Sequence, residues 1–424
     1  MKLRLYDSLE QTLKELNKNP KIYLCGPTVY DHIHIGNLAP VIIFDFLIRI
    51  LKYSKENYVY IHNITDIDDK IIAKAKELSL KEEEVSEKYT SHYLEILKKL
   101  NITPPTHMPK VSEHIGEIQN TVQELLNKGY AEIENGDVIM KIEKISNYGE
   151  LSKQKLNMLK SNEDFCLWKK MEDGKRWDSA WGKGRPGWHT ECFTFISKYA
   201  NSEVDLHGGG IDLKFPHHEN ENAHSRALNS KSLAKIWIHI GHLHTEDGKI
   251  SKSSNKKFLV KDLLKEYSAN TLRYLFLTNK YSLPLLINKE KLKEFNKEFE
   301  SYLLALNQAK SLLFINNISL NSSSEISNEF LEILNNDLNL PTALTWLQKI
   351  KKELLREIKN KNFNAINESY SILLEHLLFL GFQIPNIHTK ENLKLLNEWK
   401  EAQNLKEYSK ADAIRSELIK RKLI

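Results

Sequence analysis

Short apolar stretches alternate with longer amphipathic stretches at the start of this 424-residue chain. An apolar run over 21–26 ends at Gly26 and Pro27, and apolar residues recur at helical spacing over 38–53. Residues 58–65 alternate in the manner of a second strand, and a charged helical stretch follows over about 70–100. This order is typical of a parallel sheet and predicts an α/β, Rossmann-like domain whose first half is 1–108.

Three prolines in "NITPPTHMPK" interrupt this alternation, and we expect an inserted connective subdomain over 109–190 with one strand at 137–142. The parallel sheet should resume at 203–210 and 236–244, which places the second half of the domain at 191–248. Beyond about residue 255 the pattern is helical, and "NNISLNSSSEISN" is the only clear linker.

The composition, with 41% hydrophobic and 28% charged residues, is that of a soluble globular protein. The longest apolar run, "VIIFDFLIRI", contains Asp45 and Arg49, so no membrane span is expected. The N-terminus lacks the apolar core of a signal peptide, and a cytoplasmic location is expected. A net charge of +5 permits a polyanionic partner without requiring one.

Cysteines and histidines indicate a candidate metal site. Three cysteines are too few for a disulfide framework, and half of the 16 histidines fall between residues 189 and 244. His217 and Glu221 are four residues apart, which places them on one face of a helix, and with Cys25 and Cys192 they would suit zinc. The same spacing fits a helical His–Glu pair beside buried cysteines, and the rival ligands are His189, His207 and His218.

Two stretches are candidates for binding phosphate. "DGKISKSSNK" is a lysine-rich turn that could carry an ammonium to a phosphate, although alone it fits a solvated turn better. His34 and Asn37 stand three residues apart at a predicted helix N-terminus, which favours an anion but equally suits a turn histidine and a capping asparagine. No P-loop sequence is present, and "GKGRPG" follows no strand and contains a proline, so neither nucleotide fingerprint applies.

Taken in order, these blocks resemble the class I aminoacyl-tRNA synthetases, and more closely the cysteinyl-tRNA synthetase family. "LCGPTVYDHIHIGN" contains the HIGH-type signature as His34-Ile35-Gly36-Asn37. "NITDIDDKI", "PGWHTEC", "DLHGGGIDLKFPHHENE" and "KISKS" follow in the family's order, and "EYSKADAIRSELI" is similar to its C-terminal helix. The matching blocks span almost the whole chain.

The resemblance implies a cysteine–tRNA ligase with one Zn²⁺ per chain, held by Cys25, Cys192, His217 and Glu221. The zinc would take the substrate cysteine as a thiolate and so distinguish it from serine. L-cysteine, ATP and tRNA(Cys) are the expected partners, and a monomer is expected. The implied reaction forms cysteinyl-adenylate and then transfers the cysteinyl group to the 3′ end of the tRNA.

The resemblance also implies ATP with Mg²⁺. Charge on the phosphates would be stabilised by His34, Asn37 and Lys252. Further ATP contacts are expected from His207, Gly208, Gly209 and Lys249. Thr28, Thr65 and Trp188 are expected to bind the amino acid, although ordinary packing explains these three residues equally well.

Departures from the family pattern concern both signatures and the C-terminus. Asn37 replaces the second histidine, "SSNK" follows "KISKS" where the family usually has Leu-Gly-Asn, and the C-terminal end is expected to be shorter than usual. The family implies a signature loop and stem-contact region at 249–310 and a helical anticodon-binding region at 311–424. Two alternatives are a ligase that transfers cysteine to a small amine and a catalytically silent zinc-binding paralogue.

Overall fold

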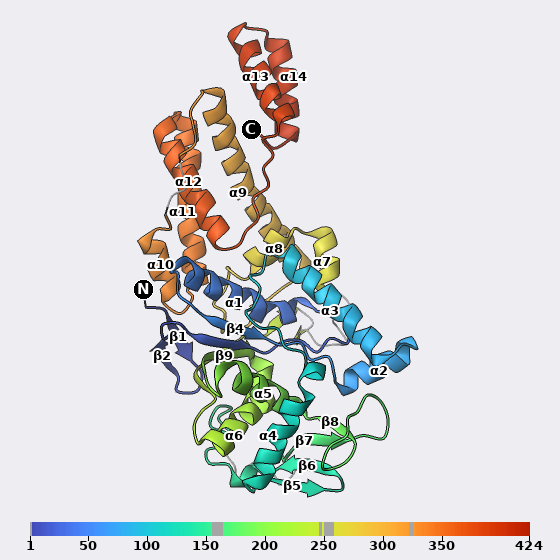
Figure 1. Cartoon of the computed structure of the whole chain (residues 1–424). Helices are drawn as coiled ribbons and strands as arrows, with labels where there is room; N and C mark the ends of the chain where they lie inside the picture. The colour runs from blue at the N-terminus through green and yellow to red at the C-terminus, as the bar shows by residue number, and fades with distance from the viewer. Residues whose placement is uncertain (1, 155–163, 246–247, 250–257, 322–324) are drawn as a thin grey trace. The chain divides into compact units, whose positions relative to one another are not determined.

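The computed structural model describes residues 2–154, 164–245, 248–249, 258–321 and 325–424 (Figure 1). The chain divides into two compact units. The first comprises Met1–Lys265, Tyr281–Leu286 and Asn335–Asp337, and the second comprises Glu266–Lys280, Ile287–Leu334 and Leu338–Ile424. Among the described residues, no helix has the length and apolar character needed to cross a bilayer.

A four-stranded parallel sheet is the centre of the first unit. Its strands, in the order β10-β9-β3-β4, are Ala234–Ile240, Val204–Gly210, Lys21–Leu24 and Val59–His62. These strands confirm the parallel sheet expected at 21–26, 58–65, 203–210 and 236–244. The order reverses between β3 and β9, and ligands of doubly wound sheets bind at the carboxyl ends of the strands at that point.

Helix α1 (Ile35–Tyr53) follows β3 and packs on the sheet. It is almost entirely buried, and Phe44 lies where a side chain at Gly208 of β9 would have to be placed. The helical stretch expected over about 70–100 consists of two helices, α2 (Asp69–Leu78) and α3 (Glu82–Lys99). They are separate because Ser79 ends α2 in the left-handed conformation, with φ of 54°.

The region between β4 and β9 contains its own antiparallel sheet, after helix α4 (Ile115–Asn127). Its strands, in the order β5-β6-β7-β8, are Ala131–Glu134, Asp137–Met140, Phe165–Lys170 and Gly184–Pro186. The sequence predicted only the second strand. Three of the four residues of β5 are exposed and β8 ends in proline, so neither carries the pattern of a buried strand.

Further short elements complete the first unit. Helices α5 (Trp188–Ala200) and α6 (Glu219–Asn229) lie on either side of β9 in the sequence. The hairpin of β1 (Arg4–Asp7) and β2 (Thr12–Glu15) begins the chain, and β11 (Leu243–Thr245), β12 (Gly248–Lys249) and β13 (Leu285–Leu286) form a small sheet of their own. The strand predicted at 236–244 is therefore two strands, β10 and β11, in different sheets.

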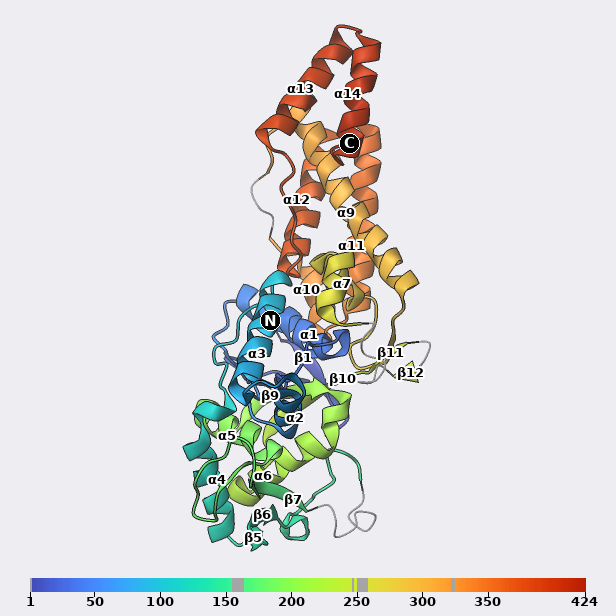
Figure 2. The same ribbon diagram turned by 90° about the vertical axis from the view of Figure 1, so that its right-hand side faces the viewer.

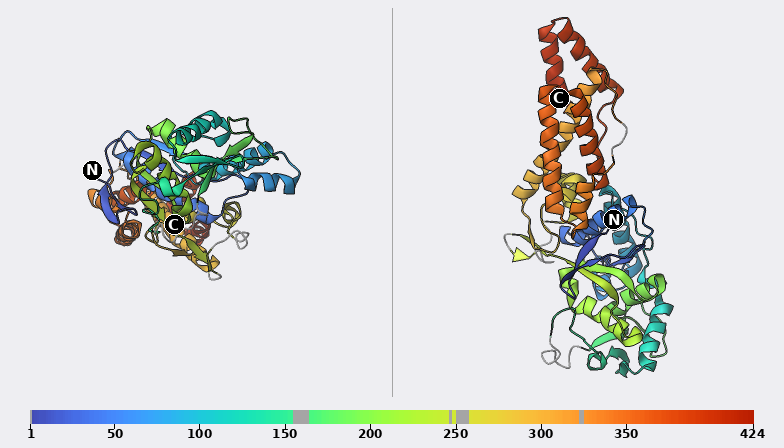
Figure 3. Two further views of the ribbon diagram at one scale, coloured as in Figure 1. Left: turned by 90° about the horizontal axis from the view of Figure 1, so that it is seen from below. Right: turned by 90° about the vertical axis from the view of Figure 1, so that its left-hand side faces the viewer.

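The second unit is helical, as the pattern beyond residue 255 predicts (Figures 2 and 3). After the short helix α7 (Val260–Glu266), its helices are α8 Ala269–Leu275, α9 Lys289–Ile315, α10 Asn328–Asn335, α11 Leu340–Asn360, α12 Phe363–Phe379, α13 Lys390–Asn404 and α14 Tyr408–Lys420. Phe299 and Tyr302 are buried in α9, and Leu396 and Leu418 join α13 to α14 in a small separate core.

Candidate active site and metal centre

Four predicted metal ligands meet beside the central sheet, near the point where the strand order reverses. Cys25 is the first residue after β3, and Cys192 lies on α5, one turn after the helix begins at Trp188. His217 lies in a short helical turn (Lys214–His218) that follows β9 and leads into α6, which carries Glu221. Three separate segments therefore bring one or two donors each to the same place.

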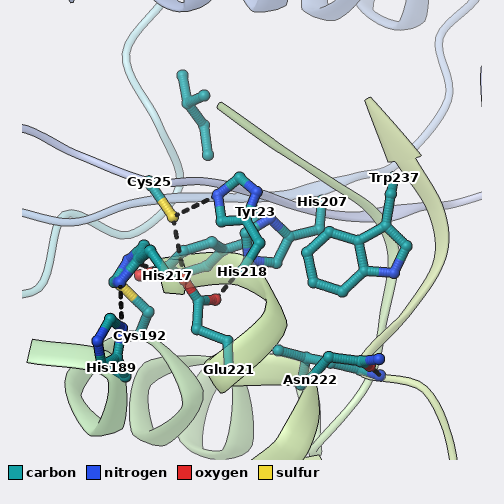
Figure 4. A network of polar contacts seen from close by, with 12 residues as sticks. Tyr23, Cys25, His189, Cys192, His207, His217, His218, Glu221, Asn222 and Trp237 are labelled. Atoms are coloured by element: carbon teal, nitrogen blue, oxygen red, sulfur yellow. Dashed lines mark hydrogen bonds and ion pairs between the residues drawn. The ribbon is translucent and has the colours of Figure 1, made fainter. Parts of the chain in front are cut away.

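The donor atoms of Cys25, Cys192, His217 and Glu221 lie within 4.8 Å of one another (Figure 4). His217 Nε2 is 2.8 Å from Glu221 Oε1 and 3.5 Å from Cys192 Sγ, and the Cys25 thiol donates to Glu221 Oε1 at 3.4 Å. Cys192, His217 and Glu221 are at most 1% exposed. Two thiols, an imidazole and a carboxylate at this spacing make a donor set that could hold a metal ion.

A second donor set overlaps the first, since Cys25 and Glu221 also lie within 4.8 Å of donor atoms of His207 and His218. Glu221 Oε2 is 2.6 Å from His207 Nε2, and Cys25 Sγ is 3.4 Å from His218 Nε2. The rivals identified in the sequence are therefore real neighbours of the site. The two sets differ in chemistry, because only the first contains two sulfur atoms.

Neighbouring rings fix the orientation of His217. Its Nδ1 atom is 2.9 Å from Nδ1 of His189, so its Nε2 atom faces Cys192 and Glu221. The indole of Trp188, predicted to bind the amino acid, stacks on the His217 ring with centroids 4.0 Å apart. Such contacts to the far side of a histidine are typical of those that hold a metal ligand in position.

The four donors also differ in their readiness to ionise. Burial would raise the pKa of Cys192, but a hydrogen bond from Cys25 and the nearby His217 lower the pKa to about 7. Burial and the hydrogen bond with Cys192 raise the pKa of Cys25. Burial opposes charge on Glu221 as well, yet His207 and His217 hold its pKa well below the usual value. One thiolate and one carboxylate are thus favoured in the site. Burial opposes charge on His217, but Glu221 and Cys192 raise its pKa to about 10, so this ring would have to lose a proton to bind a metal ion.

The HIGH-type signature forms the N-terminus of α1. His34 is the N-cap, and its Nδ1 atom accepts from the Gly36 N–H at 3.1 Å. Asn37 Oδ1 accepts from the His34 N–H at 3.2 Å, which completes a capping box. Because Nδ1 accepts, the proton of a neutral His34 ring lies on Nε2. The expected capping role of Asn37 is present, and the helix begins at Ile35, three residues before the apolar helical pattern at 38–53.

The other residues expected to contact ATP lie in different surroundings. His207 is fully buried, and its ring stacks on Trp237 with centroids 4.4 Å apart, so the described state offers its side chain to Glu221 rather than to a bound nucleotide. Gly208 and Gly209 lie in β9, where added side chains would meet Phe44 and Leu213 respectively. Lys249 belongs to β12, and Lys252 lies outside the described residues.

Thr28 and Thr65, expected at the amino acid, join the segments that follow β3 and β4. The Thr65 N–H donates to Pro27 O at 3.1 Å, and the Val29 N–H donates to Thr65 O at 3.1 Å. The Thr65 hydroxyl receives a hydrogen bond from Asn63 Nδ2 at 3.2 Å and donates to Glu191 at 3.4 Å. Sequence reasoning missed Asn63, although a polar residue directly after a buried parallel strand is a recognisable signal.

Two comparisons identify known proteins that are similar to this chain in sequence. Residues 12–297 match the family model of the tRNA synthetases class I (C) catalytic domain. A cysteine–tRNA ligase of Malacoplasma penetrans (strain HF-2) is 42% identical, and so is one of Mycoplasma mycoides subsp. mycoides SC; each alignment covers 100% of both chains.

Solved structures show the same fold at low sequence identity. The Mycobacterium tuberculosis methionyl-tRNA synthetase in complex with methionyl-adenylate superposes with a TM-score of 0.57 and 13% identity. That superposition covers 91% of this chain and 84% of the other.

Proposed function

This chain belongs to the cysteine–tRNA ligase family of class I tRNA synthetases, and on that basis we propose how its own residues carry out the ligase reaction. A carboxylate oxygen of L-cysteine attacks the α-phosphorus of ATP, and pyrophosphate leaves. The tRNA(Cys) 3′-terminal hydroxyl then attacks the carbonyl carbon of cysteinyl-adenylate, and AMP leaves. No covalent bond to the enzyme forms in either step.

The observation that carries the proposal is the donor set of Cys25, Cys192, His217 and Glu221 within 4.8 Å. Of the two overlapping sets, this one suits zinc better because it offers two sulfurs, one of which has a pKa of about 7. When bound there, zinc would favour the substrate's thiolate over its thiol. His207 and His218, in the second set, then serve to hold Glu221 and Cys25 in place.

Zinc bound to this donor set would let the enzyme distinguish cysteine from serine. A pocket alone separates two such similar side chains poorly, whereas a serine hydroxyl ionises far less readily than a thiol and is a harder ligand. Trp188 stacks on His217 and is only partly buried, so it can form a wall of the amino-acid pocket. Thr28 and Thr65 would orient the amino acid from the segments that follow β3 and β4.

The N-terminus of α1 supports the assignment of the phosphate site. Its first backbone N–H groups carry the positive end of the helix dipole, which favours the negatively charged phosphates of Mg²⁺-bound ATP. His34 Nε2 and the Asn37 amide would donate to phosphate oxygens as charge builds up on them. Lys252 and Lys249 would add ammonium groups, and Gly208 and Gly209 would let the backbone approach adenosine.

Exchange of labelled pyrophosphate into ATP tests the first step, and aminoacylation of tRNA(Cys) tests the second. Zinc-loaded protein should support exchange with cysteine and at least about a hundredfold less with serine. Absence of exchange would contradict the proposal and leave the silent paralogue as the better reading. Exchange without aminoacylation would favour the ligase that uses a small amine.

A further inference from the structure

The residue after β4, Asn63, makes more connections around the metal centre than any role assigned so far explains. It is 1% exposed, and it begins the block "NITDIDDKI" that separates β4 from α2. We propose that Asn63 is a positioning residue for cysteine recognition, which fixes the turn after Cys25 and the hydroxyl of Thr65. The inference rests on the proposed function, because it concerns the same cysteine pocket.

The side-chain amide of Asn63 joins three points. Its Oδ1 atom accepts from the Tyr23 hydroxyl at 2.9 Å and from the Gly26 N–H at 2.8 Å. Its Nδ2 atom donates to the Thr65 hydroxyl oxygen at 3.2 Å. Tyr23 and Gly26 lie on either side of Cys25 in space and sequence, so Asn63 holds the chain before and after this candidate ligand.

The backbone of Asn63 fits against the same turn. A side chain at Gly26 would place its first carbon 1.6 Å from the Asn63 carbonyl oxygen, so the two backbones are in direct contact. Glycine is required here by the close approach rather than by its φ angle. The turn that carries Cys25 therefore cannot shift toward β4, and the Asn63 amide keeps it from shifting away.

Only an amide meets the demands of this position. An aspartate would keep the acceptor for Gly26 but would lose the donor to Thr65, and it would put a second carboxylate near buried Glu191. Leucine or alanine would leave the Gly26 N–H without this acceptor in the protein interior. The chemistry thus points to orientation of neighbours, not to simple filling of space.

Position matters here because the Sγ atom of Cys25 has to stay within reach of the other donors. Its Sγ atom is 3.4 Å from both Glu221 Oε1 and His218 Nε2. A small displacement of the turn would remove this thiol from the donor set, and it would also turn the Thr65 hydroxyl away from the amino-acid pocket. Binding of cysteine should therefore suffer more than binding of ATP, whose proposed site is at the other end of "GPTVYDHIHIGN".

Asn63→Ala tests the inference in the full-length, zinc-loaded protein. We expect KM for cysteine in pyrophosphate exchange to rise roughly tenfold or more, with KM for ATP changed by less than about twofold. Release of zinc to a chelator should be faster as well, a readout that does not depend on turnover. The milder Asn63→Ser, whose hydroxyl is too short to bridge Tyr23 and Thr65, should show the same split to a smaller extent.

Asn367→Ala is the matched control. Asn367 is a buried asparagine of α12 whose amide also bridges backbone groups, from Ser319 O at 2.8 Å to Asn321 N at 3.0 Å. The Asn367→Ala protein should be less stable to heat, but its KM for cysteine and its rate of zinc release should be unchanged. If both asparagine variants alter the kinetics alike, the effect is one of general stability and the inference is wrong.

A double-mutant cycle with Thr65→Val separates positioning from mere proximity. If Asn63 acts partly through the Thr65 hydroxyl, the double variant should cost less in kcat/KM for cysteine than the two single losses multiplied together. Independent effects, or KM for cysteine and ATP rising in parallel, would overturn the inference. A wild-type protein without any cysteine-dependent exchange would instead contradict the proposed function, so the two failures are distinguishable.

Discussion

Cys192 and Cys166 show how the surroundings of a residue decide its chemistry. Cys192 touches His217 and shares a hydrogen bond with Cys25, and its pKa falls to about 7. Cys166 lies in β7, where burial disfavours the thiolate and raises its pKa to about 12. One thiol is therefore suited to bind a metal ion at neutral pH, and the other is not.

Cys192→Ser should remove a proposed zinc ligand while leaving the fold intact. We expect zinc affinity to fall by at least about a hundredfold, with a comparable loss of cysteine-dependent exchange, because a hydroxyl is a poor substitute for a thiolate. Zinc content measured by mass spectrometry and exchange kinetics check this. Cys166→Ser is the control and should retain full metal content; a Cys192→Ser protein with stoichiometric zinc and normal activity would show that the site lies elsewhere.

His62 gives the protein a stability that depends on pH. It is buried at the end of β4, bonded to Leu24 O at 3.0 Å and to the Tyr93 hydroxyl at 2.6 Å, and burial lowers its pKa to about 4. The unfolded chain binds a proton at this residue below pH about 6.5. Stability is therefore full above that pH and is lost as pH falls toward 4, by on the order of 2 kcal/mol between pH 7 and pH 5.

His62→Phe should reduce this dependence. The variant is expected to be less stable at pH 7, because the hydrogen bonds to Leu24 and Tyr93 are lost, but its urea midpoint should fall less between pH 7 and pH 5 than that of the wild type. Other buried histidines, such as His239 and His376, should keep part of the dependence of stability on pH in both proteins. Equal slopes would mean that His62 does not stay neutral in the folded protein.

The sequence predicted which residue types would form the candidate metal site, but it did not decide between the histidines. His189, His207 and His218 remain rivals of His217 in the sequence, because the spacing of His217 and Glu221 also fits an ordinary helical pair. The choice depends on which nitrogen faces the sulfurs, and that depends on contacts such as His189–His217, formed between α5 and the turn after β9. The four ligands came from family resemblance, and the structure brings their donor atoms together.

At the scale of elements, the start of α1 combines a structural and a chemical task in Asn37. Its Oδ1 atom caps the helix through the His34 N–H, while the proposed function requires its amide to donate to phosphate. Asparagine can perform both tasks because it carries an acceptor and a donor. Aspartate can perform only the first.

Asn37→Asp should therefore separate the two tasks. Capping is retained and the helix dipole favours the new charge, so thermal stability should be unchanged or slightly higher. Exchange should fall by roughly a hundredfold, because a donor is lost and a carboxylate faces the phosphates. Thermal unfolding and the KM for ATP are the measurements. Equal activity of the two proteins would remove Asn37 from the phosphate site.

The packing of α1 on β9 explains a glycine of the "HGGG" block. A side chain at Gly208 would lie 2.7 Å from Phe44 and 2.8 Å from Ile238, closer than real contacts of this kind. Gly208→Ala should lower the free energy of unfolding by about 2 kcal/mol. Gly116→Ala in α4, where a side chain meets nothing within 4 Å, should be neutral or stabilising by up to about 1 kcal/mol. Thermal unfolding of both variants checks the contrast, and an undisturbed Gly208→Ala protein would contradict this packing.

Helices and strands were predictable where burial requires a long run of apolar residues, and they were less predictable elsewhere. The parallel strands and α1 follow from apolar runs, whereas β5 and β8 are short and carry few buried side chains of strand type. The break between α2 and α3 depends on Ser79 adopting a left-handed conformation, which local sequence signals poorly. Two aspartates of "NITDIDDKI" have structural roles: Asp68 caps α2, and Asp66 accepts from the Ser112 N–H at 3.0 Å.

For the whole molecule, the two steps of the proposed reaction should respond differently to salt. The chain carries a net charge of +5, and the second step requires it to bind a polyanion. Cysteine is a small zwitterion, so its binding releases few counterions, whereas each tRNA phosphate that is neutralised releases one.

Raising salt from about 50 to 200 mM should therefore raise KM for tRNA(Cys) by tenfold or more, while KM for cysteine changes by less than about twofold. Initial rates of aminoacylation and of exchange, measured in the same buffers, test this. A salt-independent KM for tRNA would indicate that the protein binds the nucleic acid with few charged contacts.

The pairing of β3 with β9 has a consequence for how the protein is made. Leu24 and Val204 are 180 positions apart, so at typical rates of translation β9 leaves the ribosome roughly 10 to 40 seconds after β3. During that interval one edge of β3 has no partner strand, and Cys25 waits as a lone thiol for the donors on α5 and α6. The proposed zinc site can therefore be completed only late in synthesis, and a nascent chain stalled before residue 221 would hold an incomplete donor set open to oxidation.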